Sequence, residues 1–546
     1  MSTAIQNLDG RAQAIVDAQQ ALVSLQPGQD DLPTWFQSWN RLKLKIQNLW
    51  LEQIVAQHTQ PDQEETEVLH RRFSEHWLPQ MERLDGALQQ QALDSGLAGL
   101  HPAVAAALAE EPEASPRLLE LRTQERQLFK DYQNIVSQQQ VEYAGEHLTV
   151  AAAEARLRTT LERSEREALW RRIKAAELAC APALDALFGR LLQVRRDIAV
   201  ESGHPNYASL NWADRADTIA STETLLEAIG EVFEGVERGL QQHRAEALGV
   251  QTLRPWDLDV ALTSPTTFQL PIEEYVPTAE RVLNRLDVQF GDVVRQIRDH
   301  GGFDLAPRPG KPNGNICAHY MDEGRSVLIC NFSGGVESFR GLLHELGHAS
   351  HHHSISSVPD HVFWDFTGFW EVQEFYAFVF TYIGLLELFE LHAVSDDERR
   401  WYLRSTVERI MERFSDVEER TRLELWLYQQ EPPTTDEIGA EYRRLTRTAE
   451  VDWTGLDEIL DKRWQKPHTF KYAFYNIDYA IAMLAALQFV HAYQQDKSAA
   501  LRRLKCSMLL GATVGAKRIF AEAGITYPFQ RAQLEIARSV LEGWLS

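Results

Sequence analysis

The chain has few cysteines and no long hydrophobic run. Its four cysteines are scattered and form no CxxC pair, which favours free thiols in a reducing compartment over a disulfide framework. The most apolar stretch, at 479–487, is about half of the roughly 18 residues that a membrane-spanning helix needs. No basic segment followed by an apolar one opens the sequence. We therefore expect a cytoplasmic protein that has no membrane partner.

Positive charge is also in short supply. The formal net charge is −24, so a nucleic acid would be repelled at long range and is not expected as a partner. The length of 546 residues exceeds what one compact core usually holds. We expect two or more lobes, or one large bowl-shaped domain.

Most of the chain has the period of an α-helix. Apolar residues recur every three or four positions over 222–240 and over 280–298, which predicts a helix in each range. The segment 315–332 is different, because two short apolar runs flank the turn sequence MDEGR and together predict a β-hairpin. A weak change in composition suggests a helical N-terminal lobe over 1–200 and a catalytic lobe over 201–546.

The sequence GLLHELGHASHHH begins at Gly341 and contains an HExxH motif. His344 and His348 are four residues apart, so on a helix they lie on one face and can share one zinc ion. Glu345 follows the first of them and can take a proton from a water that the metal activates. Gly347 allows another backbone to come close.

A zinc ion needs a third protein ligand. His352 is excluded if the helix continues, because eight residues of helix rise about 12 Å. A variant in which glycine bends a third histidine back does not match here, so we expect His351, His352 and His353 to form a solvated or packed helix end. The buried-looking helix after Gly368 carries two acids, Glu371 and Glu374. We predict Glu371 as the third ligand and keep Glu374 as the alternative.

With these residues assembled, the chain resembles the thimet oligopeptidase and oligoendopeptidase F family of zinc peptidases, and the oligoendopeptidase F branch more closely. Five further stretches carry the resemblance. They are RSVLICNFSGGVESFRGLLHELGHA, PHTFKYAFYNIDYAIAMLAAL, LLGATVGAKRIFAEAGI, HPNYASLNWADRADTIASTETLLEAI and LRPWDL. The likeness covers roughly 200–540 and thins out before it.

The resemblance implies a mainly α-helical fold, a large bowl or clamshell with a deep central channel and a small antiparallel β-hairpin beside the zinc helix. It implies zinc on His344, His348 and Glu371, with Glu345 as the general base. His468 matches a substrate-binding histidine, and Tyr475 and Tyr479 match tyrosines that bind substrate and stabilise the oxyanion. The family usually has a small hydroxyl residue and a second glutamate where this chain has Glu374 and Phe378.

The function we expect is a zinc-dependent oligopeptidase that hydrolyses internal bonds of short, unfolded peptides with one zinc per chain. A carboxypeptidase that trims peptide C-termini is an alternative. A different class, a non-catalytic peptide-binding protein that zinc stabilises, is disfavoured by the intact Glu345, because a structural site has no use for a base.

Overall fold

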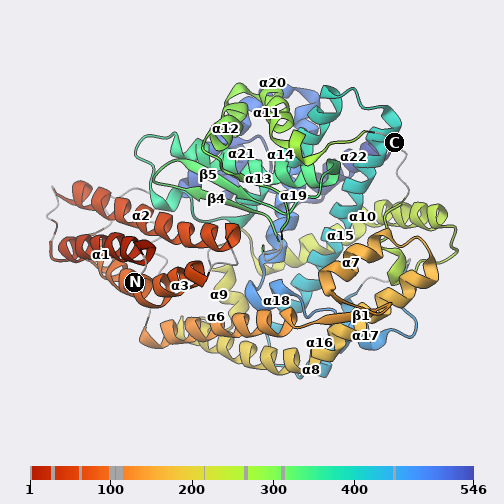
Figure 1. Ribbon diagram of the computed structural model, residues 1–546, viewed down its shortest axis with the longest axis horizontal. Coiled ribbons are helices and arrows are strands. Elements are labelled where there is room, and N and C mark those ends of the chain that lie inside the picture. The colour runs from red at the N-terminus through yellow and green to blue at the C-terminus, as the bar shows by residue number, and fades with distance from the viewer. Residues whose placement is uncertain are drawn as a thin grey trace. The chain divides into compact units, whose positions relative to one another are not determined.

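The computed structural model describes residues 3–25, 27, 31–60, 64–96, 105, 115–213, 215–262, 268–308, 311, 314–446 and 451–546. Helices dominate these residues, so the prediction of a mainly α fold is confirmed (Figure 1). The predicted hairpin is also present: β4 (Ile316–Tyr320) pairs antiparallel with β5 (Arg325–Ile329). A short strand, β3 (Phe303–Asp304), runs parallel to β5, so the sheet order is β3-β5-β4.

The chain divides into two compact units. The first contains Met1–Glu113, Thr267–Arg399 and Ala482–Tyr527. Its helices are α1 (Thr3–Val23), α2 (Leu32–Thr59), α3 (Glu64–Arg72), α4 (Leu78–Asp94), α11 (Tyr275–Leu286), α12 (Val288–Asp299), α13 (Gly335–Ser356), α14 (Trp370–Leu391), α20 (Lys497–Met508) and α21 (Ala516–Glu522). The hairpin and the HExxH helix therefore belong to the same unit.

The second unit contains Ala114–Thr266, Arg400–Ile481 and Pro528–Ser546. Its helices are α6 (Pro116–Ser137), α7 (Val150–Thr159), α8 (Arg163–Glu201), α9 (Tyr207–Trp212), α10 (Ile219–Leu248), α16 (Thr435–Leu445), α17 (Asp457–Lys462), α18 (Pro467–Lys471) and α22 (Arg531–Leu545). It also has a small hairpin of β1 (Gln140–Tyr143) and β2 (Glu146–Thr149). Two helices, α15 (Asp396–Tyr428) and α19 (Tyr475–Gln495), extend across the division.

The predicted boundary near residue 200 does not coincide with this division. The N-terminal helices belong with the HExxH helix because α2 covers the hairpin, where Leu51 packs with Ala318 and Tyr320. Asn40 of α2 also accepts a hydrogen bond from the Phe363 N–H at 2.8 Å. Helix α8 instead remains in the second unit with α9 and α10.

The second predicted helix, over 280–298, is two helices. Asp287 separates α11 from α12 with an extended backbone, and its side chain accepts a hydrogen bond from the Gln289 N–H at 3.0 Å as the N-cap of α12. The apolar period continues through Asp287, so the sequence pattern does not reveal the break. The first prediction, over 222–240, is confirmed by α10.

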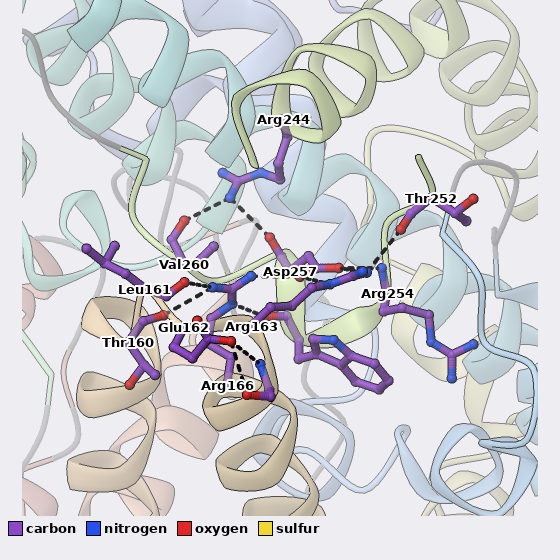
Figure 2. Close-up of polar contacts among 12 residues, drawn as sticks. Thr160, Leu161, Glu162, Arg163, Arg166, Arg244, Thr252, Arg254, Asp257 and Val260 are labelled. Carbon is purple, nitrogen blue, oxygen red and sulfur yellow. Dashed lines mark hydrogen bonds and ion pairs between the residues drawn. The ribbon is translucent and has the colours of Figure 1, made fainter. Parts of the chain in front are cut away.

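The segment LRPWDL is held against the start of α8 by a buried carboxylate (Figure 2). Asp257 has no exposed side-chain surface and pairs with Arg163 at 2.6 Å and Arg166 at 2.9 Å. It also accepts the Arg254 N–H at 2.9 Å. Burial would raise the pKa of Asp257, but these donors together lower it. The carboxylate thus stays charged and ties two distant parts of the second unit together.

Helix α14 is the central apolar element of the first unit. Among the described residues it is the one single helix long and apolar enough to cross a membrane, yet 89% of its apolar window is buried inside the protein, as in a core helix. Figure 1 shows α14 beside α13, and α13 in turn contacts β4 and β5. This packing decides which acids of α14 reach the HExxH histidines.

Candidate metal centre and aromatic cluster

The HExxH motif lies in the middle of α13. Gly334 and Gly335 precede it with φ values of 97° and 82°, a region that favours glycine, and they turn the chain from β5 into the helix. His344 and His348 lie one turn apart with ring centroids 5.0 Å from each other. The motif is therefore helical, as its spacing predicts.

Gly347 explains how a second helix comes close. A Cβ at this position would lie 2.6 Å from Cα of Ala377 and 2.9 Å from the Tyr376 carbonyl oxygen, both on α14. Only glycine fits such an approach without displacing backbone. The contact brings α14 alongside the two histidines.

The acid that α14 presents to the histidines is Glu374. Its Oε2 lies 3.4 Å from Nε2 of His344. One ligand atom each from His344, His348 and Glu374 lies within 4.8 Å of the others, and no other such group of three occurs among the described residues. We call these three residues the His–Glu group.

Glu371 does not belong to the His–Glu group. It lies one turn before Glu374 and accepts a hydrogen bond from the Tyr527 hydroxyl at 3.3 Å. The ring of Phe378, one turn after Glu374, packs on His344 with centroids 5.1 Å apart. Zinc binding by Glu371 therefore stays a prediction, and the geometry favours the alternative, Glu374.

The His–Glu group fits a zinc ion by its donors and its spacing. Two imidazoles and one carboxylate are a donor set of catalytic zinc sites, which keep a fourth position for water or substrate. Two ligands about 2.0–2.1 Å from a tetrahedral zinc lie about 3.3–3.4 Å apart. The separation of 3.4 Å between His344 and Glu374 matches that value.

The pKa values of Glu345, His348 and His344 are shifted in different directions. Burial raises the pKa of Glu345 to about 7, with a further contribution from the charge of Glu374. Burial lowers the pKa of His348 to about 4. Burial also acts to lower the pKa of His344, but Glu374 and Glu345 together raise it. A carboxylate with a pKa near 7 can accept and return a proton at neutral pH.

The three histidines after the motif are packed and lie outside the His–Glu group. His351 is buried and lies against Tyr376, with ring centroids 4.3 Å apart. His352 and His353 lie beside His319, at 5.1 and 5.3 Å between centroids. Burial lowers the pKa of His352 to about 3 and that of His353 to about 4, so these rings are neutral. The sequence predicts a solvated or packed helix end for these three histidines, and the structure shows the packed alternative.

The second unit brings His468, Tyr475 and Tyr479 together; we call these three residues the aromatic cluster. Tyr472 lies beside Tyr475, with ring centroids 5.8 Å apart, and is not part of the cluster. The rings of His468 and Tyr475 are stacked at 5.8 Å and 7° between planes. Tyr475 and Tyr479 meet edge to face at 5.0 Å. Burial, followed by the charges of Arg420 and Arg413, lowers the pKa of His468 to about 4. A neutral imidazole thus faces a phenol that can donate a hydrogen bond.

Two contacts at these sites lie beyond what the sequence indicates. Arg413 of α15 lies over the Tyr479 ring, 4.9 Å from its centroid. Tyr527 reaches Glu371 from 156 positions away. No spacing rule links residues that far apart, so only the fold reveals them.

A helical fold with HExxH on one helix and a carboxylate from the next is typical of peptidases that use a metal. The chain belongs to peptidase family M3, whose model matches residues 157–538. The match includes both helices of the His–Glu group and the whole aromatic cluster. The protein is therefore a peptidase, and the predicted family is confirmed.

Solved structures share the fold over nearly the whole chain. Pz peptidase A with an inhibitor has a TM-score of 0.84 at 18% identity, covering 99% of this chain and 97% of that one. A protein described as a candidate oligoendopeptidase F has a TM-score of 0.82 at 19% identity, covering 99% and 96%. Oligoendopeptidase F from Enterococcus faecium has a TM-score of 0.68 at 13% identity, covering 99% and 98%. No curated protein sequence matches this chain.

Proposed function

We propose that this M3 peptidase is a zinc-dependent endopeptidase that hydrolyses internal bonds of short, unfolded peptides. The observation that carries the proposal is the His–Glu group with Glu345 beside it. Zinc in such a site supplies Lewis-acid chemistry, which polarises a carbonyl and makes water acidic at neutral pH. His344, His348 and a carboxylate of α14 would hold it, and Glu374 is the better placed of the two acids.

Glu345 acts as the general base in this proposal. It is 6% exposed and directly follows His344 in the chain, so it lies where it can take a proton from water and pass it to the leaving amine. A purely structural metal site would have no use for a base at this position.

The aromatic cluster supplies substrate contacts. The Tyr475 or Tyr479 hydroxyl donates a hydrogen bond to the oxyanion that develops on the scissile carbonyl. His468 binds the peptide as a neutral imidazole. The strand β4 is an edge of its sheet by strand order, so an extended peptide can add to it as a further strand.

We also propose that the enzyme works in the cytoplasm on peptides that other proteases release, with neither a nucleic acid nor a membrane as its partner. The scattered thiols and the net charge of −24 support this setting.

The test is a fluorogenic peptide with blocked termini, assayed before and after chelation. An endopeptidase cleaves it internally, loses activity with the metal and recovers with one equivalent of zinc. Release of residues from a free C-terminus, with the amidated peptide left intact, would instead favour the carboxypeptidase alternative. Undiminished cleavage by a metal-free preparation would remove the zinc proposal.

A further inference from the structure

The residues of the aromatic cluster lie on both sides of the segment that joins α18 to α19. His468 lies in α18 and Tyr475 begins α19. The last carbonyls of α18 and the N–H of Phe474 in the link are backbone groups that neither helix satisfies. Two buried ionisable side chains from elsewhere in the second unit, Arg195 and Glu424, bind those groups.

Arg195 of α8 binds the end of α18. It is fully buried, and its guanidinium donates to the carbonyl oxygens of Thr469 at 3.0 Å, Phe470 at 2.9 Å and Lys471 at 3.4 Å. These are the last carbonyls of the helix, the end at which a cation is favoured. The guanidinium also donates to Glu125 at 2.7 Å and to the Tyr428 hydroxyl. The position of the helix that carries His468 is thereby fixed to α8.

Glu424 of α15 binds the start of α19. It is 1% exposed, and its Oε2 accepts the Phe474 N–H at 2.9 Å. Its Oε1 is buried with no hydrogen-bond partner among the described residues. This buried acid is therefore aimed at a single backbone N–H, the one immediately before Tyr475.

Phe474 needs such a restraint. Its φ is 64°, a left-handed conformation that a residue with a Cβ rarely adopts. Its ring is buried against Trp212, with centroids 4.7 Å apart at 81°. The conformation persists because the surroundings impose it, and it directs the residue that follows.

We propose that Glu424 and Arg195 are positioning residues that hold Tyr475 against His468 for peptide hydrolysis. Arg195 fixes the helix that carries the histidine, and Glu424 fixes the backbone that begins the tyrosine helix. Together they set the stacked pair at 5.8 Å. The proposal rests on the proposed role of Tyr475 in hydrolysis, and neither Glu424 nor Arg195 is required to touch the peptide.

The experiment compares Glu424→Leu with Glu424→Gln in the full-length enzyme. Glutamine keeps a carbonyl oxygen for the Phe474 N–H, whereas leucine leaves that N–H buried and unpaired. We expect Glu424→Leu to lower kcat at least about tenfold with KM within about twofold, because Tyr475 would act in the transition state. Glu424→Gln should retain most of the turnover, and zinc content should be unchanged in both.

A double-mutant cycle separates positioning from stability. In a Tyr475→Phe background the same Glu424→Leu change should cost less than about twofold in kcat, because the hydroxyl it positions is gone. Glu419→Leu is the matched control: Glu419 is also buried on α15 but accepts from the Tyr442 hydroxyl at 2.9 Å. It should lower the melting temperature and leave kcat unchanged in both backgrounds.

Equal losses from Glu424→Leu in the two backgrounds would overturn the positioning role while leaving the proposed function intact. Unchanged kcat for Tyr475→Phe alone would instead remove the tyrosine's role and this proposal with it. If Glu424→Leu does not fold, Glu424→Asp, which withdraws the carboxylate by one methylene, goes through the same cycle. A smaller loss in the Tyr475→Phe background would then support the positioning role, and equal losses would overturn it.

Discussion

Oε2 of Glu374 lies 3.4 Å from Nε2 of His344, and the two residues come from neighbouring helices. The absence of a side chain at Gly347 allows those helices to approach closely enough for this contact. The relationship selects one acid of α14 over the other as the partner of the histidines.

Glu374→Gln should weaken zinc binding by about two orders of magnitude or more, because a carboxylate ligand is replaced by a neutral amide. Glu371→Gln should keep about one zinc per chain, since Glu371 contacts Tyr527 and lies outside the His–Glu group. Metal content after dialysis against a weak chelator, measured by mass spectrometry, checks both variants. The reverse pattern would restore Glu371 as the third ligand.

Gly347→Ala should destabilise the first unit. The added Cβ would lie 2.6 Å from Cα of Ala377, so a helix must shift. Such overpacking typically costs about 1–3 kcal/mol of the free energy of unfolding. The control is Gly86→Ala in α4, where nothing lies within 4 Å and the melting temperature should not fall. Equal melting temperatures for both variants would mean that α13 and α14 do not meet so closely.

Replacing the two tyrosines of the aromatic cluster tests the oxyanion role. Loss of a donor to a developing oxyanion costs about 10²–10³ in kcat. We expect Tyr475→Phe to show such a loss with little change in KM. Tyr472→Phe is the control, because that side chain is 47% exposed and is not assigned to catalysis. Full activity of both Tyr475→Phe and Tyr479→Phe would exclude a phenol from the reaction.

The stability of the second unit should depend on pH through Glu424. Burial raises its pKa to about 7, while the Phe474 N–H and the charges of Arg195 and Arg420 act against burial. Between its ordinary value of 4.5 and about 7, the folded state therefore binds a proton that the unfolded state releases. Stability from this group is complete below that window and is lost as pH rises through it, by up to about 1.4 kcal/mol per pH unit.

Glu424→Gln removes that proton exchange. Urea unfolding at pH 5, 6 and 7 should show the variant gaining stability relative to the natural chain as pH rises. A constant difference across the three pH values would show that Glu424 does not titrate in this window.

The sequence predicts the local elements better than their assembly. HExxH predicts a helix with both histidines on one face, because residues four apart lie one turn apart. MDEGR predicts the hairpin because it is a turn sequence between two short apolar runs. The break at Asp287 escapes prediction because the apolar period runs through it unchanged. The choice between Glu371 and Glu374 depends on how α13 and α14 pack, which no pattern within α14 encodes.

The division into units is the least predictable feature. Each unit is built from three separate stretches of chain, and α2 belongs with a hairpin more than 250 positions later, where Leu51 meets Ala318. Composition changes along a chain report only contiguous domains. The clamp of Arg195 on residues 469–471 is equally hidden, because arginines in long helices are common and almost always exposed.

The central claim is that a metal held by His344 and His348 works with Glu345 as the base in peptide hydrolysis. Zinc content and turnover of Glu345→Gln, measured on one preparation, test it most directly. We predict about one zinc per chain, as in the natural enzyme, with kcat lowered by about three orders of magnitude or more. Turnover close to that of the natural enzyme with zinc retained would contradict the claim.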